Sequence, residues 1–204
     1  VALSQFKRRI KWWCPNGIHL NTVDKGLLSL MKESGCYAVA FGIESGSERV
    51  RRDMKKDISL DRLREMVEFS SRIGLRTQGF FILGYPTERQ EDIEETIRLA
   101  KSLPLLRASF CLFQPLVGSE IYRELVRKNK LDASQERRVL SDYSKASITT
   151  EFISDVSLIK KLQRKAILGF YLRPKIFFRL LLENLTLSQI KELARIIKQY
   201  VLSR

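Results

Sequence analysis

Apolar and polar positions alternate along the first 131 residues in a regular strand–helix order. Each continuous apolar run, typical of a buried strand, is followed by a stretch with apolar residues at helical spacing. Because this order repeats four times, it predicts parallel strands covered by helices. The predicted strands lie at 9–17, 36–43, 75–86 and 106–115. The predicted helices lie at 22–35, 59–74, 87–104 and 119–131.

Local signals mark where several of these helices begin and end. Gly35 and Gly74 follow two of them, where a left-handed cap favours glycine. Thr87 with Gln90 predicts a capping box at the start of the third helix, and Pro104 ends it. Each strand–helix unit has the length of a βαβ crossover. The fold class is therefore α/β, as a partial (β/α) barrel of parallel strands.

The pattern changes after residue 131. Residues 132–158 are polar and irregular, which indicates a linker. Residues 159–204 predict a basic, mostly helical C-terminal extension, with a break near Arg173–Pro174 because the residue before proline avoids the helical region. We expect three parts, at 1–131, 132–158 and 159–204.

The ends of the predicted strands are rich in glycine and polar residues. In parallel α/β folds, ligands bind where these carboxyl ends converge. The sequence FGIESGS, residues 41–47, places Glu44 and two serines directly after a buried run. The alternative is that Ser45 or Ser47 only caps a short helical turn, while Glu44 accepts backbone N–H bonds.

Four motifs together resemble the later half of a radical S-adenosylmethionine enzyme barrel, in the branch that often carries an N-terminal cobalamin-binding domain. The resemblance covers about residues 5–130. A weaker likeness extends to GFYLRPK in the basic tail. The motifs are FGIESGS at 41–47, MKK at 54–56, GFFILGYPTE at 79–88 and QPLVGSEIY at 114–122.

The resemblance implies a set of S-adenosylmethionine contacts. Glu44 would bind the ammonium or ribose hydroxyls, and Lys56 would meet the ligand carboxylate. The third strand, with Ile82 and Gly84, would flank adenine. The alternative for Lys56 is a solvated lysine at a helix start. Glu88 is expected at a helix start, favoured by the helix dipole. The candidate cofactor-binding residues are Glu44, Ser45, Ser47, Lys56, Ile82 and Gly84.

The cluster-binding motif of that family, Cys-x-x-x-Cys-x-x-Cys, does not occur in this sequence. The cysteines are Cys14, Cys36 and Cys111, too far apart for a [4Fe–4S] loop or a zinc motif. We therefore assign no catalytic residue and no metal ligand to this chain. The cluster, and cobalamin if used, would belong to a full-length protein with further barrel strands before Val1. We expect Cys36 and Cys111 to be small buried side chains and the compartment to be the cytoplasm.

The formal net charge of +14 is concentrated in the tail. Residues 159–204 contain eleven Lys or Arg and two Glu. An amphipathic basic helix of this kind either packs on the barrel, which we favour, or contacts an anionic membrane surface. Trp12 and Trp13 beside KRRIK fit an aromatic-covered strand edge better than a nucleic-acid site.

Three functions remain open on the sequence alone. The first, which we favour, is a part of a radical S-adenosylmethionine enzyme that performs methyl transfer, rearrangement or cyclisation on an unknown substrate. The second is a non-catalytic module that binds S-adenosylmethionine or a partner protein. The third is an unrelated half-barrel acting on a phosphorylated metabolite, for which only Val117–Gly118–Ser119 offers a phosphate loop.

Overall fold

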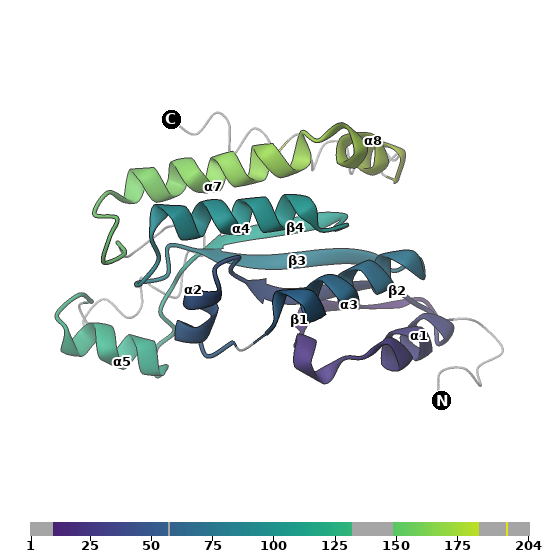
Figure 1. Cartoon of the computed structure of the whole chain (residues 1–204), viewed down its shortest axis with the longest axis horizontal. Helices are drawn as coiled ribbons and strands as arrows, with labels where there is room; N and C mark the ends of the chain where they lie inside the picture. Colours follow the sequence, from purple (N-terminus) through teal and green to yellow (C-terminus); the bar gives the residue numbers. More distant parts are fainter. Residues whose placement is uncertain (1–9, 57, 132–148, 184–194, 196–204) are drawn as a thin grey trace.

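Four parallel strands form a single sheet in the order in which they occur in the sequence. The computed structural model describes residues 10–56, 58–131, 149–183 and 195. Neighbouring strands pair in the order β1-β2-β3-β4, and every pairing is parallel (Figure 1). This confirms the predicted α/β class. The strands are β1 (Trp12–Ile18), β2 (Cys36–Glu44), β3 (Arg76–Leu83) and β4 (Arg107–Leu112).

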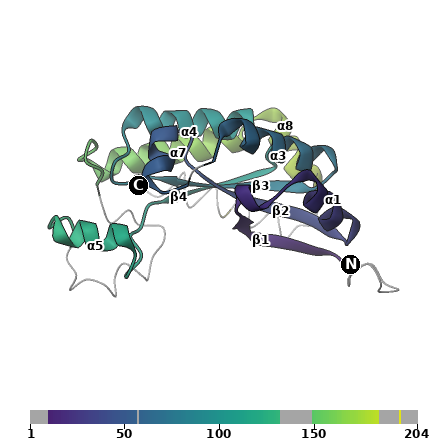
Figure 2. The same cartoon turned by 60° about the horizontal axis from the view of Figure 1, so that its bottom comes forward.

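Helices connect successive strands and lie mainly on one face of the sheet. Figure 2 shows α3, α4 and α7 together on that face, whereas α5 lies apart at one end. The connecting elements are η2 (Leu20–Thr22), α1 (Lys25–Glu33), α2 (Glu48–Asp53), α3 (Leu60–Arg72) and α4 (Gln90–Ser102). After the last strand come α5 (Glu120–Arg127), α7 (Val156–Tyr171) and α8 (Pro174–Glu183).

Two predicted helix ends are confirmed, and one predicted helix start is wrong. Gly35 and Gly74 adopt the left-handed region, with φ of 101° and 78°. Helix α4 begins at Gln90, three residues later than expected, and Arg89 precedes it in extended geometry. Its capping contact is the Arg89 N–H donated to the Asp92 carboxylate at 2.8 Å, so Thr87 and Gln90 form no capping box.

The main hydrophobic core lies between the sheet and these helices. Side chains at alternate strand positions point into it, because a strand has a side-chain period of two. Phe81 stacks on Phe110 with ring centroids 5.1 Å apart, and Phe170 of α7 contacts Phe110 edge-on. These buried strand residues are Val39, Phe41, Ile43, Phe81, Leu83, Phe110 and Leu112.

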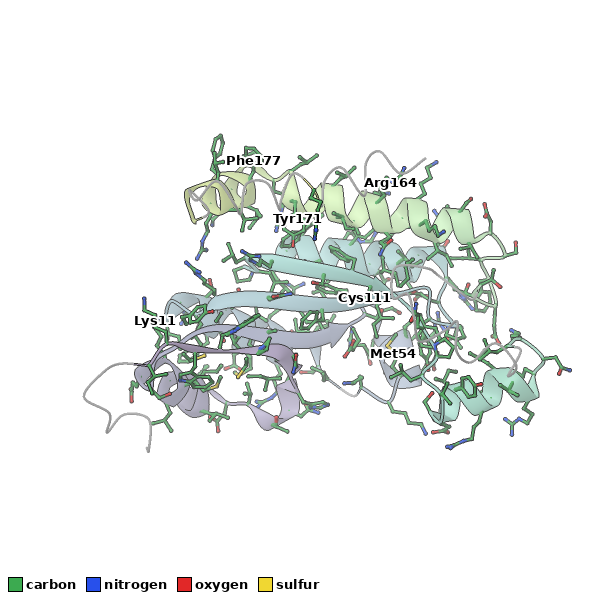
Figure 3. All side chains as sticks on the ribbon, turned by 180° about the vertical axis from the view of Figure 1, so that it is seen from behind. Lys11, Met54, Cys111, Arg164, Tyr171 and Phe177 are labelled. Carbon is green, nitrogen blue, oxygen red and sulfur yellow. The ribbon has the colours of Figure 1, made fainter. Side chains whose placement is uncertain are left out.

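The other face of the sheet carries the intervening residues, which are more exposed. Gln78 and Ser109 lie there on neighbouring strands and are hydrogen-bonded at 3.1 Å. Cys111 is also on this face, as Figure 3 shows from behind the helices. Cys36 is buried as expected, but the prediction of a buried Cys111 is wrong, since its thiol-bearing side chain is exposed.

Helix α7 packs on α4 and runs along the outer edge of β4. Its buried side chains include Ile159, Leu162 and Phe170, which confirms packing for this part of the tail. The Gln163 amide donates to the Phe110 carbonyl at 2.7 Å, and Tyr171 bonds both main-chain groups of Ala108. These contacts satisfy backbone groups that an edge strand otherwise exposes.

The predicted break between the tail helices is confirmed. Helix α7 ends at Tyr171, and α8 begins at Pro174. The Arg173 guanidinium donates to the carbonyls of Phe170 and Lys101, at the carboxyl ends of α7 and α4. Cationic groups are favoured there because of the helix dipole. Predictions for 132–148 and for most residues after 183 lie outside the described residues.

Within the residues that the structure describes, no helix combines the length and apolar character needed to cross a bilayer.

Candidate S-adenosylmethionine-binding strand ends

Strand β2 ends on Glu44 in an uncommon backbone conformation. Its φ of 65° lies in the left-handed region, which costs a non-glycine residue about 1 kcal/mol or more. The pairing of β2 with β3 is also irregular between Gly42 and Glu44. Strain of this kind is retained only where the surrounding structure enforces it, and it is frequent at functional sites.

The Glu44 carboxylate turns back along the strand toward Gly42. A Cβ atom added at Gly42 would lie 3.0 Å from Glu44 Oε1, so the glycine leaves room for the carboxylate. The side chain of Glu44 is 15% exposed. A partly buried carboxylate with an open side is suited to bind a cationic or hydroxyl-bearing ligand.

The structure places Lys56 beside Glu44. Lys56 Nζ lies 3.4 Å from Glu44 Oε1, and its side chain is 35% exposed. The main-chain N–H of Lys56 donates to the Arg51 carbonyl at 2.8 Å, and this bond fixes the loop that carries Lys56. The preceding residue, Lys55, has a φ of 57°. An acid and a base therefore stand side by side at the carboxyl end of the sheet.

Ser45 and Ser47 lie beneath this pair and are buried. The Ser45 hydroxyl is 3.2 Å from the Thr96 hydroxyl, and Ser47 donates to Asp92 at 2.6 Å. Ser47 precedes α2 at the N-cap position, but its side chain makes no capping bond. Both hydroxyls are thus engaged with α4, a role that neither sequence-based reading anticipated.

Gly46 allows this close approach of the loop to α4. Its N–H donates to the Thr96 hydroxyl at 2.8 Å. A Cβ atom at Gly46 would lie 2.5 Å from the main-chain nitrogen of Thr96, a separation that backbone atoms do not tolerate.

A buried arginine supports the same loop. Arg51 of α2 is 2% exposed, and its guanidinium donates to the Ser45 carbonyl at 2.9 Å. Its Nε is buried and has no hydrogen-bond partner. Sequence reasoning missed Arg51, because an arginine within ERVRRD reads as a surface residue of a charged helix.

Asp92 joins the loop to a charged network. It accepts hydrogen bonds from Ser47, from the Arg89 N–H and from the Arg49 guanidinium. Burial alone would raise its pKa, but these hydrogen bonds and the positive charge of Arg49 outweigh burial and lower the pKa of Asp92. Asp92 is thus an ionised anchor for both Ser47 and Arg49.

Ile82 and Gly84 lie at the end of β3. Ile82 is half-buried and packs against a second apolar cluster, formed by Val50, Tyr85, Phe113 and Leu125. Gly84 has a φ of 83°, and its N–H donates to Glu88.

Glu88, expected to be a helix-start carboxylate favoured by the helix dipole, lies two residues before α4, and its side chain turns into the protein. Its side chain is fully buried, and one oxygen accepts from the main chain of Gly84 and Tyr85 while Oε1 has no partner. Burial raises the pKa of Glu88 to about 8, and the two hydrogen bonds offset only part of the rise. Its position before Gln90, rather than inside α4, lets the side chain turn inward.

These residues fit the organic ligand but not an iron–sulfur cluster. Glu44 and Lys56 offer an acceptor and a donor to polar groups, and the glycine turn and Ile82 offer backbone and apolar surface beside them. The three cysteines do not converge, and no cluster of three metal-binding side chains occurs in the described ranges. Cluster ligation therefore does not belong to these residues.

The radical SAM superfamily profile matches residues 7–100, which include the β2 and β3 ends. Through these residues, the chain belongs to the radical SAM superfamily. Members of this superfamily use S-adenosylmethionine with a [4Fe–4S] cluster. The match confirms the resemblance to radical SAM enzymes and includes three of the four motifs, at 41–47, 54–56 and 79–88.

Two relatives and one solved structure extend the comparison. An uncharacterized methyltransferase of Pyrococcus horikoshii is 33% identical over 86% of this chain and 37% of its own length. Cytidylyl-2-hydroxyethylphosphonate methyltransferase of Streptomyces wedmorensis is 35% identical over 62% of this chain and 25% of its own. The radical SAM enzyme coproporphyrinogen III oxidase of Escherichia coli shares the fold, with a TM-score of 0.51 at 13% identity over 74% of this chain and 30% of that one. The chain thus spans well under half of each.

Proposed function

We propose that this chain supplies the S-adenosylmethionine-binding strand ends of a radical SAM enzyme that transfers a methyl group. The observation that carries the proposal is the placement of Glu44 beside Lys56 at the carboxyl end of β2. Residues outside this sequence would bind the [4Fe–4S] cluster, and cobalamin if it is used.

The acid–base pair matches the amino-acid part of S-adenosylmethionine. That part carries one ammonium group and one carboxylate group on the same carbon. The Glu44 carboxylate would accept a hydrogen bond from the ammonium or from ribose hydroxyls, and Lys56 would donate to the ligand carboxylate. Because both bonds are charge-assisted, each is stronger than a bond between neutral groups.

The other candidate residues take supporting positions in this proposal. The Ser45 and Ser47 hydroxyls already bond Thr96 and Asp92, so their part is to hold the loop that presents Glu44. Ile82 offers an apolar side chain to the adenine ring. Gly84 shapes the turn after β3, because it adopts a positive φ and leaves room for the side chain of Ile159, which a Cβ atom would approach to 3.2 Å.

Methyl transfer is favoured because both relatives named above are methyltransferases. Rearrangement or cyclisation on the same scaffold is the other reaction open to a radical SAM enzyme. A non-catalytic module that only binds S-adenosylmethionine or a partner protein is the alternative function. The substrate stays undefined.

Equilibrium dialysis of the 204-residue chain against labelled S-adenosylmethionine tests the binding site. We expect Glu44→Gln and Lys56→Met each to weaken binding about tenfold, the equivalent of one charge-assisted hydrogen bond. Glu48→Gln is the matched control, since Glu48 lies four residues away and its side chain is 66% exposed. Circular dichroism would verify that each variant is folded.

Two results would contradict the proposal. One is the same affinity in Glu44→Gln as in the parent chain. The other is no saturable binding by the parent chain, which would assign the ligand contacts to another part of the protein.

A further inference from the structure

Helix α8 exposes large apolar side chains that the core does not use. They form a patch at the junction of α7 and α8 and along α8, and the two phenylalanine rings contact each other edge-on with centroids 5.7 Å apart. The exposed fractions are 62% for Leu172, 42% for Phe177, 59% for Phe178 and 40% for Leu181.

The spacing along α8 separates this patch from the packed side of the helix. Phe177, Phe178 and Leu181 lie on one side of the helix, because Leu181 is four residues from Phe177 and three from Phe178, and both spacings make neighbours on a helix surface. Ile176 and Leu180 occupy a different face and are buried, at 7% and 4% exposure. The helix is therefore anchored by one apolar face and presents a second one outward, as Figure 3 shows for Phe177.

The chain around the patch is rich in basic residues. The stretch 156–181 contains no Asp or Glu. Lys175 is exposed and lies next to the outward apolar face of α8. On α7, Lys165 Nζ lies 3.7 Å from Glu94 Oε1. Lys160 and Lys161, nearer the start of α7, are exposed. The basic residues of the stretch are Lys160, Lys161, Arg164, Lys165, Arg173, Lys175 and Arg179.

We propose that α8 docks on an anionic membrane surface. Phe177, Phe178 and Leu181 would enter the headgroup–acyl boundary, and the adjacent Lys175 would meet lipid phosphates. Amphipathic helices bind such interfaces through apolar burial together with attraction of basic residues to anionic lipids. The inference does not rest on S-adenosylmethionine binding.

The composition of the patch favours a membrane over the other occupants. Phe177 and Phe178 have π-faces of the kind that stack on bases of single-stranded nucleic acid, but Leu172 and Leu181 have neither a π-face nor a hydrogen-bonding group and suit an apolar environment. A second copy of this chain would bring two basic stretches together, and like charges repel.

Docking through α8 leaves the strand ends accessible. Figures 1 and 2 place α8 at the end of the molecule away from α5, whereas the turns after β2 and β3 lie toward α2 and α5. A membrane-bound molecule would thus present the Glu44–Lys56 pair to water.

Vesicle co-sedimentation of the 204-residue chain tests the proposal. Vesicles of phosphatidylcholine alone are compared with vesicles containing one quarter phosphatidylglycerol, at low and high salt. We expect binding to the anionic vesicles only, weakened by salt. Phe177→Ser/Phe178→Ser should reduce it at least tenfold, and Lys175→Gln about fivefold, since one basic residue near the surface contributes roughly that factor.

Matched controls use equally exposed residues elsewhere. Leu30→Ser on α1 replaces a side chain that is 59% exposed, and Lys55→Gln replaces one that is 72% exposed. Both should bind vesicles like the parent chain. If the double variant fails to fold, Phe178→Ser alone is used in its place, and its thermal melting curve verifies that it is folded.

Three results would overturn the proposal. The first is equal binding to neutral and anionic vesicles, or none. The second is full binding by a folded Phe178→Ser variant. The third is a different occupant, seen as α8-dependent binding to a single-stranded RNA oligonucleotide without vesicle binding, or as α8-dependent dimers in sedimentation velocity.

Discussion

The Arg51 guanidinium donates a hydrogen bond to the main-chain carbonyl of Ser45, 2.9 Å away and out of contact with water. This bond fixes the peptide between Ser45 and Gly46, one residue after Glu44. Because Glu44 holds a φ of 65°, the loop needs such support to keep its carboxylate beside Lys56.

Replacing Arg51 should therefore destabilise the protein through this loop. Arg51→Met keeps most of the volume but leaves the Ser45 carbonyl without its donor, and we expect a loss of about 1–2 kcal/mol in the free energy of unfolding. Arg51→Ala should lose roughly a further 1–2 kcal/mol, because packing of the aliphatic stem is also removed. Urea denaturation measures both.

The control is Arg52→Met on the same helix, whose side chain is 70% exposed and should change stability by less than about 0.5 kcal/mol. If Arg51→Met is as stable as the parent chain, the buried guanidinium does not support the loop.

The Tyr171 hydroxyl should protect the Ala108 amide, on the outer edge of β4, from hydrogen exchange. Its hydroxyl accepts from the Ala108 N–H at 3.2 Å and donates to the Ala108 carbonyl at 2.9 Å. Tyr171→Phe should lower the free energy of unfolding by about 1–2 kcal/mol and speed hydrogen exchange of the Ala108 amide. Exchange measured by NMR reports that amide directly. Unchanged exchange of the Ala108 amide in a folded Tyr171→Phe variant would refute the role.

Glu88 should make stability fall as the pH rises above its ordinary titration range. In the folded state its pKa is raised to about 8 from an ordinary value near 4.5, so the folded protein holds a proton that the unfolded chain releases. Stability is therefore highest, as far as Glu88 is concerned, below about pH 4.5. It decreases up to about pH 8 and changes little beyond. Each unit of pKa difference corresponds to about 1.4 kcal/mol, so the total is several times that.

Denaturation at a series of pH values from 5 to 9 checks this dependence. Glu88→Gln keeps a carbonyl oxygen for the Gly84 and Tyr85 N–H groups but does not titrate, so its stability should be nearly flat in that interval. Asp92 titrates in the opposite sense only at lower pH, because its pKa is lowered. Parallel curves for the parent and the variant would show that Glu88 is not the group responsible.

The sequence predicts the order of elements well because local signals and packing agree. Apolar runs such as CYAVAFGI form buried strands, and glycines at 35 and 74 take the positive φ that helix ends require. The break before Pro174 likewise depends only on neighbouring residues. The radical SAM resemblance rests on the same local motifs.

The errors come from contacts between distant segments. The thiol of Cys111 is exposed because no helix in the described part of the chain covers that face of the sheet, and the apolar run FCLF does not tell which face each residue joins. Ser45 and Ser47 bond partners on α4 that are 51 and 45 residues away. Glu88 is buried because the turn after β3 folds over it. Contact with a ligand stays a prediction for all six candidate residues, Glu44, Ser45, Ser47, Lys56, Ile82 and Gly84.

The sheet has two unlike borders. Along β4, side chains of α7 occupy main-chain groups of Ala108 and Phe110, whereas β1 pairs with β2 alone among the described residues. At the β4 edge, another strand would have to displace helix α7. At the β1 edge, another strand could pair through ordinary ladder hydrogen bonds. Growth of this sheet is therefore directional, and any barrel that includes it would be continued from the side of β1.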